Sequence, residues 1–301
     1  MTKLPILQSN DLIDLVAPAS RCSDRQLEAL KDMLCSWGLR VRIHPAIFGD
    51  DLLCANHDIE RFQQLRDALY AADSKAIICV RGGYGATRII PYLEQIPAPE
   101  KPKLFVGMSD ITCLHLYMQQ AWQWSTLHSG VAPDKFSPES LAQLRKILLG
   151  ELNFLSYPLI PMNNLAKKAA ALQGKIVGGN LTLVQASIGT SWVLPGRGQF
   201  IFLEEVSERG YRLDRMLEHL RQAGLFSGAQ AIILGDFTGG LEPDGSSLVD
   251  EVLLRFAHNI PIPVLRLRGV GHDYISHPLP LNMRTQLNLG EGSAIKIELA
   301  N

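Results

Sequence analysis

The chain has 301 residues, of which 47% are hydrophobic and 20% charged, and its 29 basic and 30 acidic residues leave a net charge of −1. This composition predicts a sizeable folded core and excludes an intrinsically disordered chain, while the balanced charge argues against binding to nucleic acid or to an anionic membrane surface. No stretch approaches the ~18 consecutive apolar residues of a transmembrane helix, and the N-terminus shows no cleavable signal pattern.

The five cysteines point to a reducing compartment. Their number is odd and no two of them form a CxxC pair, so we expect free thiols rather than a disulfide framework or a zinc site. The sequence therefore predicts a cytoplasmic protein.

Strand-like and helix-like segments alternate through the first half of the chain. Short apolar runs predict strands, and apolar residues at helical spacing between capping residues predict helices. Such alternation is typical of a parallel sheet covered by helices on both faces. The predicted strands lie in 11–20, 39–47, 75–80, 103–107 and 123–130, and the predicted helices in 23–38, 58–73, 85–96 and 111–122.

The pattern changes near residue 150. Residues 153–174 contain two prolines and no clean period, so we expect a linker or a crossover there. The rest of the chain is richer in strands and has fewer helices, which predicts a second, mixed or barrel-like domain. We therefore expect an N-terminal α/β domain over residues 1–150, a linker over 151–170 and a C-terminal β-rich domain over 171–301.

The segment "VRGGYGATR" at 80–88 joins a predicted strand to a predicted helix. Glycines at 82, 83 and 85 allow positive φ angles and a close approach of the backbone to a ligand. The segment is a poor dinucleotide fingerprint, because Arg88 stands where a third glycine would permit tight helix packing. Two interpretations stay open: a structural turn, or a loop that presents N–H groups to a substrate or an oxyanion.

Ser109, in "VGMSDITC", lies between a predicted strand and a predicted helix. This is the arrangement of a nucleophile elbow, in which the N–H of the next residue, Asp110, would point toward an oxyanion. A helix N-terminus also favours negative charge. The motif is G-x-S-D rather than G-x-S-x-G, and the alternative is that Ser109 or Asp110 caps the helix.

A serine nucleophile needs a base, usually a histidine that a carboxylate orients. Among the eight histidines, His272 in "RGVGHDYISHP" is favoured, because it follows a predicted strand and two glycines. His277, five residues on, and His128, at a predicted strand end, are competing candidates.

Glu204 and Glu205 are adjacent at the end of the apolar run "FIFLEEV". Adjacent side chains of an extended strand leave opposite faces, so we expect one glutamate to point inward and the other to face solvent or a peripheral contact. A buried carboxylate is costly unless it is paired, and orienting a histidine would pair it. A solvated strand end is the alternative.

Metal chemistry is less favoured, since the chain has no HExxH and no Cys/His ligand spacing. The nearest approach to a ligand cluster is His272-Asp273…His277. We expect no metal and no cofactor. Arg81 and Arg88 are chemically suited to bidentate binding of a substrate carboxylate.

Six segments, several of which contain the residues discussed above, occur in this order along the chain: "VRGGYGATRIIPYLE", "GMSDIT", "GGNLTLVQASIGTSW", "FLEEVSERGYRLDRML", "AIILGDFTG" and "GVGH". Together they resemble the LD-carboxypeptidase family of serine peptidases, from about residue 12 to about residue 285. Each motif alone is weak, but six in order with suitable spacing are specific. The resemblance implies a flavodoxin-like α/β domain, then a mixed β-rich domain, with the active site between them.

The resemblance also implies roles for particular residues. Ser109 would be the nucleophile, His272 the base and Glu204 the carboxylate that orients it. The remaining implied site residues lie on the two loops just described and would supply oxyanion N–H groups or contact the substrate: Gly83, Asp110 and Tyr84.

The family cleaves the LD-peptide bond before the terminal D-alanine of murein tetrapeptides, in cell-wall recycling. The resemblance therefore implies a muropeptide substrate, no cofactor and a homodimer. Two alternatives stay open. One is a family relative that hydrolyses a peptide–nucleotide antibiotic, which would need an aromatic side chain such as Trp192 to stack on a nucleobase. The other is a non-catalytic α/β protein that binds a small ligand.

Overall fold

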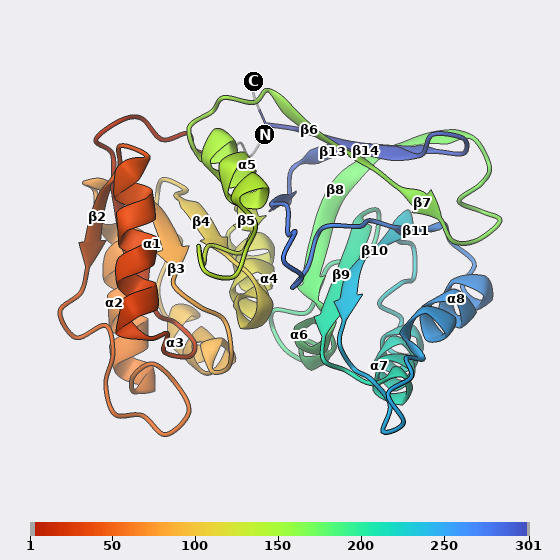
Figure 1. Cartoon of the computed structure of the whole chain (residues 1–301), viewed down its shortest axis with the longest axis horizontal. Helices are drawn as coiled ribbons and strands as arrows, with labels where there is room; N and C mark the ends of the chain where they lie inside the picture. The colour runs from red at the N-terminus through yellow and green to blue at the C-terminus, as the bar shows by residue number, and fades with distance from the viewer. Residues whose placement is uncertain (1–3, 300–301) are drawn as a thin grey trace.

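The computed structural model describes residues 4–299 and consists of two β-sheets with flanking helices (Figure 1). The first sheet has six strands in the order β12-β5-β4-β3-β1-β2. All its neighbouring pairs are parallel except β12–β5. Its strands are β1 (Leu12–Val16), β2 (Arg40–Ile43), β3 (Ser74–Cys79), β4 (Leu104–Gly107), β5 (Thr126–His128) and β12 (Leu279–Leu281).

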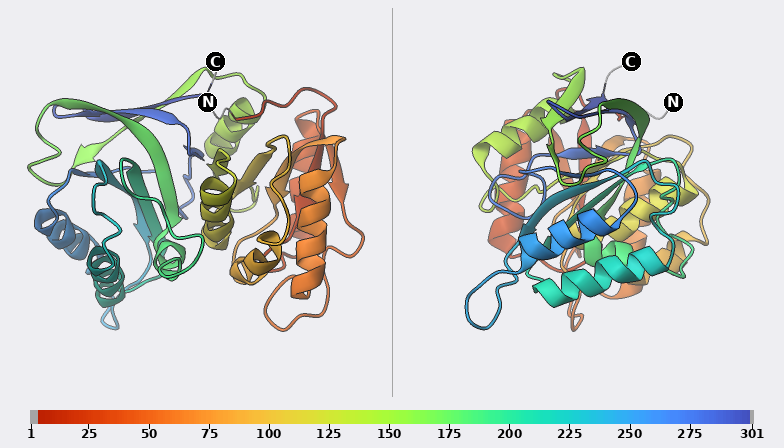
Figure 2. Two further views of the ribbon diagram at one scale, coloured as in Figure 1. Left: turned by 180° about the vertical axis from the view of Figure 1, so that it is seen from behind. Right: turned by 90° about the vertical axis from the view of Figure 1, so that its right-hand side faces the viewer.

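Both faces of this parallel sheet are covered. Ala76 and Ile78 of β3 pack in one core with α1 (Asp24–Ser36), whereas Ile77 and Cys79 pack in another with α2 (Asp58–Tyr70). Helix α1 is in front of the sheet in Figure 1, and α2 is in front when the molecule is seen from behind in Figure 2. The parallel order β2-β1-β3-β4-β5 is that of flavodoxin-like folds.

Three further helices complete the first half. The predicted helix at 85–96 is a 3₁₀ turn, Ala86–Ile89, followed by the short α3 (Ile90–Leu93). Helix α4 (Thr112–Ala121) follows another 3₁₀ turn, Ser109–Ile111. The sequence analysis did not identify α5 (Pro138–Leu148), although Ser137 caps it by accepting a hydrogen bond from the Ser140 N–H.

The second sheet has eight strands in the order β6-β14-β13-β8-β9-β10-β11-β7. Strands β8 to β11 run parallel, and the outer pairs are antiparallel. Strands β6 and β7 are separated by Leu159 alone yet lie at opposite ends of the order, so the sheet curls nearly into a barrel. Its strands are β6 (Phe154–Pro158), β7 (Ile160–Pro161), β8 (Ala170–Asn180), β9 (Phe200–Val206), β10 (Ala231–Thr238), β11 (Val264–Arg266), β13 (Arg284–Leu289) and β14 (Ala294–Glu298).

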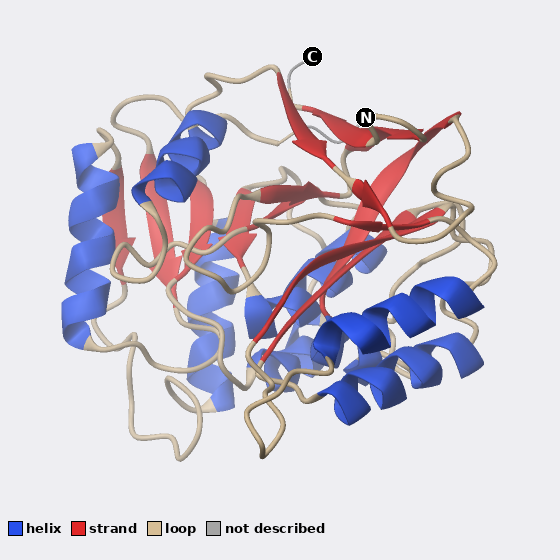
Figure 3. Cartoon of the chain, turned by 45° about the vertical axis from the view of Figure 1, so that its right-hand side comes forward, coloured by secondary structure: helices blue, strands red, loops and turns tan. Residues whose placement is uncertain are grey.

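Three helices accompany this sheet: α6 (Leu181–Ala186), α7 (Gly210–Gln222) and α8 (Val249–Asn259). Helices α7 and α8 lie side by side along it (Figure 3). The predicted fold class is confirmed: an α/β unit with a parallel sheet precedes a mixed, β-rich unit. None of the helices described in residues 4–299 has both the length and the apolar character to cross a bilayer.

The two sheets belong to one packed body. Helix α4 packs against β8 and α6, and β12 returns from late in the chain to pair with β5. The loops that follow β3 and β4 therefore face loops of the second sheet. The candidate site residues Gly83, Ser109 and His272 lie on these loops.

Candidate active site

A cavity of about 380 Å³ lies where the carboxyl ends of strands from the two sheets meet. Its wall includes residues after β1, β3, β4 and β5 of the first sheet, the last residue of β9 and a residue after β11 of the second. Ligand sites of parallel sheets lie at this edge, because the loops after neighbouring strands converge there. Three predicted site residues line the cavity: Gly83, Ser109 and His272.

Ser109 sits on a strained turn at the cavity wall. Strand β4 ends at Gly107, and Ser109 has a φ of +65°, a left-handed conformation that non-glycine residues rarely adopt. Such strain costs about 1–3 kcal/mol and concentrates at functional sites. Ser109 is not the N-cap residue of either helix that follows, since these positions are held by Met108 and Ile111, and neither of them forms a side-chain cap hydrogen bond within residues 4–299. The turn therefore has the geometry of a nucleophile elbow rather than of a plain helix cap.

His272, in the loop after β11, is held against Glu204 of β9. The His272 Nδ1 lies 2.7 Å from Glu204 Oε2, and the two side chains are 6% and 0% exposed. A Cβ on the preceding Gly271 would lie 2.9 Å from the Cβ of Asp236, so close packing requires glycine there. When Nδ1 donates its proton to the carboxylate, Nε2 is left free to accept a proton from the cavity side.

The charge on Glu204 follows from the same contact. Complete burial raises the pKa of the Glu204 carboxyl, but the charge and hydrogen bond of His272 lower it by more. The net pKa lies below the ordinary value, so Glu204 is an ionised carboxylate beneath the imidazole.

Glu205 does not face solvent, the first of its two expected environments, but makes a buried contact away from His272. It is 4% exposed, and its carboxylate accepts hydrogen bonds of 2.8 Å each from Asn180 Nδ2, Thr182 N and Thr182 Oγ1. Strand β9 lies between β8 and β10, so both of its faces are covered. Strand alternation still holds, because Glu204 reaches His272 while Glu205 stabilises the N-terminus of α6.

The other candidate histidines lie off the cavity wall. The His277 ring stacks on Tyr157, with ring centroids 6.1 Å apart. His128 is buried against Phe202, and burial lowers the pKa of its imidazole to about 4. Within residues 4–299, no group of three or more His, Cys, Asp or Glu side chains is arranged to hold a metal ion.

Two backbone N–H groups beside Ser109 are free. Among the described residues, the N–H groups of Gly83 and Asp110 donate no hydrogen bond. Gly82 keeps the space in front of them open: a Cβ there would lie 2.8 Å from the Ser109 Cβ and 3.1 Å from the Asp110 N. The two loops therefore form a pocket of N–H donors that only glycine at position 82 permits.

Replacing Gly82 by Ala should lower kcat about 10²–10³-fold, the usual effect of losing one oxyanion donor. The added methyl group would push the Ser109 turn away from the N–H groups. Ala at Gly189 is the control, because a Cβ there meets nothing within 4 Å although its φ is +83°. Steady-state kinetics and thermal melts of both variants would check this, and unchanged kcat in the Gly82 variant would contradict it.

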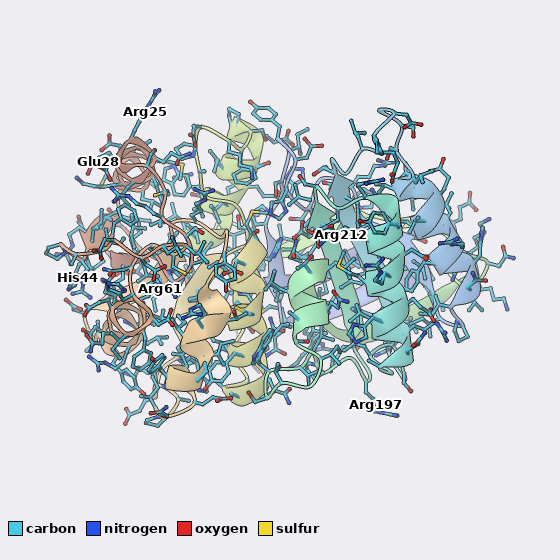
Figure 4. The ribbon with its side chains drawn as sticks, turned by 90° about the horizontal axis from the view of Figure 1, so that it is seen from below. Arg25, Glu28, His44, Arg61, Arg197 and Arg212 are labelled. Carbon is cyan, nitrogen blue, oxygen red and sulfur yellow. The ribbon has the colours of Figure 1, made fainter. Side chains whose placement is uncertain are left out.

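The glycine loop is anchored by a buried arginine. Arg61 on α2 is fully buried (Figure 4) and donates to the carbonyl oxygens of Gly85 and Asn56, both at 2.9 Å. It also donates to the Pro18 carbonyl in the loop after β1. These bonds fix the loop from inside, so its free N–H groups are held in place without a ligand.

Asp110 has a structural side chain besides its free N–H. Its carboxylate is 3% exposed and accepts a 2.8 Å hydrogen bond from the Ala86 N–H. Burial raises the pKa of the Asp110 carboxyl to about 6, although Ala86 and Arg61 act in the opposite direction. The turn that carries Ser109 is thus tied to the segment that follows the glycine loop.

This raised pKa predicts a dependence of stability on pH. Between pH 4 and pH 6 the folded protein holds a proton on Asp110 that the unfolded chain has lost, so stability should fall as pH rises. The effect is at most about 3 kcal/mol, from 1.36 kcal/mol per pKa unit. Denaturant unfolding of the parent and of Asp110→Asn across this range should show the parent losing stability relative to the variant. Parallel curves would contradict the expectation.

Tyr84 lies outside the cavity wall. Its side chain is 47% exposed, and its N–H donates a 3.0 Å hydrogen bond to Ser20 Oγ. The two arginines considered for carboxylate binding also separate: Arg81 lines the cavity, whereas Arg88 pairs with Asp58 at 2.7 Å.

Sequence reasoning missed other parts of the wall. Gln26 lines the cavity from the first turn of α1, and Lys135 lines it from the loop that follows β5. Neither residue belongs to a motif. Only a general rule could have pointed to them: in a parallel sheet the segments that follow the strands all lie at the same edge, where a ligand binds.

Comparison with known proteins supplies the context for this geometry. Residues 13–129 match the model of the LD-carboxypeptidase N-terminal domain, and residues 173–287 match that of the LD-carboxypeptidase C-terminal domain. A Rickettsia conorii protein with a provisional carboxypeptidase name is 40% identical, over 92% of this chain and 88% of its own length.

Two further relatives have more specific names. The murein tetrapeptide carboxypeptidase of Pseudomonas aeruginosa is 28% identical, over 86% of this chain and 87% of its own length. The crystal structure of a muramoyltetrapeptide carboxypeptidase from Oxalobacter formigenes is 25% identical and superposes with a TM-score of 0.81, covering 95% of this chain and 98% of that one.

Proposed function

Since the chain belongs to the LD-carboxypeptidase family, we propose that it is a serine LD-carboxypeptidase that removes the terminal D-alanine from murein tetrapeptides. The family is one of peptidases, so the chain is a hydrolase of peptide bonds. The observation that carries the serine mechanism is the buried Glu204–His272 pair at the wall of the cavity that also holds Ser109 on its strained turn.

The proposed mechanism follows from these positions. His272 Nε2 accepts the Ser109 proton while Ser109 Oγ attacks the carbonyl carbon that precedes the terminal residue. The N–H groups of Gly83 and Asp110 donate to the oxyanion, and Glu204 stabilises the imidazolium. His272 then gives the proton to the leaving amine, D-alanine departs, and water resolves the ester. Within the described chain no hydrogen bond joins Ser109 to His272, and the proposed mechanism requires this contact to form when the substrate binds.

The proposed setting is cell-wall recycling in the cytoplasm, with the protein acting as a homodimer. The names of the Pseudomonas and Oxalobacter relatives support a muropeptide substrate. The alternative of a peptide–nucleotide substrate lacks its aromatic contact at Trp192, because that side chain is 6% exposed and packs in the core.

The deciding experiment is mass spectrometry of disaccharide-tetrapeptide incubated with the protein. Loss of one alanine from the D-alanine form, but not from the L-alanine diastereomer, is the expected result. A fluorophosphonate probe should label Ser109, as located by peptide mapping. Hydrolysis of an aminoacyl nucleotide with no action on the tetrapeptide would replace the proposed substrate. Absence of labelling and of both hydrolyses would favour a non-catalytic ligand-binding protein.

Activity should survive EDTA, because the proposed nucleophile is a side-chain hydroxyl rather than metal-bound water. Rates before and after chelation and desalting would check this. Full loss of activity that Zn²⁺ restores would overturn the serine mechanism.

A further inference from the structure

We propose that Arg81 and Lys135 form a carboxylate-binding subsite in the Ser109 cavity, which restricts cleavage to the last peptide bond of the substrate. This inference rests on the proposed function, since it assigns the leaving residue of that reaction to one part of the cavity.

The charge of the cavity wall is one-sided. Arg81 and Lys135 line it together with His272, and none of its lining residues is Asp or Glu. Within residues 4–299, neither cation forms an ion pair with a carboxylate. Exposed lysines and arginines elsewhere commonly do, as Arg88 does with Asp58. The cavity therefore presents positive charge that the protein itself does not neutralise, and a negatively charged ligand would complete it.

The Arg81 side chain lies along the loop that carries the proposed oxyanion donor. Its Nη1 donates a 2.9 Å hydrogen bond to the Arg21 carbonyl, which leaves its other N–H groups available. Its Nε is 3.9 Å from the position of a Cβ on Gly83. One polar contact thus fixes the guanidinium beside Gly83, and a planar guanidinium binds a carboxylate in a bidentate manner.

The distance to the reacting atoms fits a terminal carboxylate. Gly82, the residue next to Arg81, lies against Ser109, since a Cβ on Gly82 would be 2.8 Å from the Ser109 Cβ. In a peptide the carboxyl carbon of the last residue lies only about 3–4 Å beyond the preceding carbonyl carbon. A carbonyl at Ser109 therefore brings the terminal carboxylate next to the glycine loop and Arg81.

Lys135 supplies the second positive charge from a separate loop. It follows β5, and its Nζ lies 5.2 Å from the centroid of the Phe136 ring, which itself lines the cavity. The cation–π contact keeps the ammonium group near the cavity without neutralising it. A substrate with a terminal carboxylate gains two charge-assisted contacts that an amidated peptide or an internal peptide bond does not offer, which favours cleavage at the last bond.

The test compares the tetrapeptide with its C-terminal carboxamide. The parent should favour the acid by at least 10²-fold in kcat/KM. Arg81→Met and Lys135→Met should each lower kcat/KM for the acid at least tenfold, mainly through KM, and leave the amide nearly unchanged. Arg25→Met is the matched control: Arg25 points outward from α1 and does not line the cavity (Figure 4), so the preference should persist.

A binding measurement separates this inference from the proposed function. In a Ser109→Ala background, calorimetry should show tighter binding of the acid than of the amide, whether or not the parent hydrolyses the peptide. Arg81→Met should reduce this difference, and Arg81→Met combined with Lys135→Met should abolish it. Equal binding of acid and amide, or an acid preference that survives loss of both cations, overturns the subsite. A parent that binds the acid selectively but cleaves neither peptide retains the subsite and refutes the carboxypeptidase activity.

Discussion

Replacing His272 by Ala should lower kcat roughly 10⁴–10⁶-fold, as removal of a triad base does in serine hydrolases. The serine hydroxyl is too weakly acidic to attack without a base, and His272 is the histidine that lines the Ser109 cavity. The variant should also lose stability, because it leaves the fully buried Glu204 carboxylate without its partner, so the rate must be measured on protein shown to be folded. Single-turnover kinetics on the tetrapeptide would measure the loss, and a thermal melt would exclude unfolding.

His277→Ala is the matched control and should retain at least a tenth of the parent activity. The His277 ring packs on Tyr157 and is not part of the cavity wall, so its removal costs packing rather than proton transfer. If His277→Ala were inactive and His272→Ala active, the base would have to be assigned to His277.

The parallel sheet could be predicted from the sequence because its strands are buried on both faces. The last four residues of β3, 76–79, and all of β4 are uninterrupted apolar runs, and every residue in them is buried. Other strands give weaker local signals. β6 alternates over five residues only and ends in proline, and the pairing of β12 with β5 joins segments some 150 positions apart. Such a pairing depends on the whole fold.

The site, too, has some residues that local sequence could predict and others that depend on the whole fold. The Ser109 turn and the glycines before His272 are local features, so residue types and spacing pointed to them. The contact between His272 and Glu204 also follows once the strand is assigned, because alternation separates the two glutamates. The burial of Glu205 could not be predicted, since it depends on Thr182 packing over the other face of β9.

The place of Lys135 in the cavity wall and the need for glycine at position 82 could not be predicted either, although the glycine loop was already a candidate for presenting N–H groups. Each exists only where loops from different strands meet. Sequence therefore predicts the residues with a chemical signature, and the assembled fold decides which neighbours give them an environment.

Replacing Glu204 by Gln should lower kcat by roughly two to four orders of magnitude, in line with changes to a triad carboxylate. Glutamine keeps the shape but loses the charge that stabilises the imidazolium. It can also present an N–H₂ group to His272 Nδ1, which favours the tautomer whose other nitrogen carries the proton and is unable to accept one from Ser109. Stability should change little, because Glu204 Oε1 already lacks a hydrogen-bond partner in the described structure.

Glu205→Gln should instead lose stability and keep its kcat, so the two variants together distinguish a catalytic role from a structural one. Three donors, from Asn180 and Thr182, converge on the Glu205 carboxylate, so an amide there would face some of them with its own N–H₂ group. We expect a loss of about 1–3 kcal/mol in the free energy of unfolding with kcat largely retained. Denaturant unfolding and steady-state kinetics on both variants separate the two roles. An inactive Glu205→Gln beside a fully active Glu204→Gln would show that the acid of the triad is misassigned, since only the neighbouring carboxylate would then act through His272.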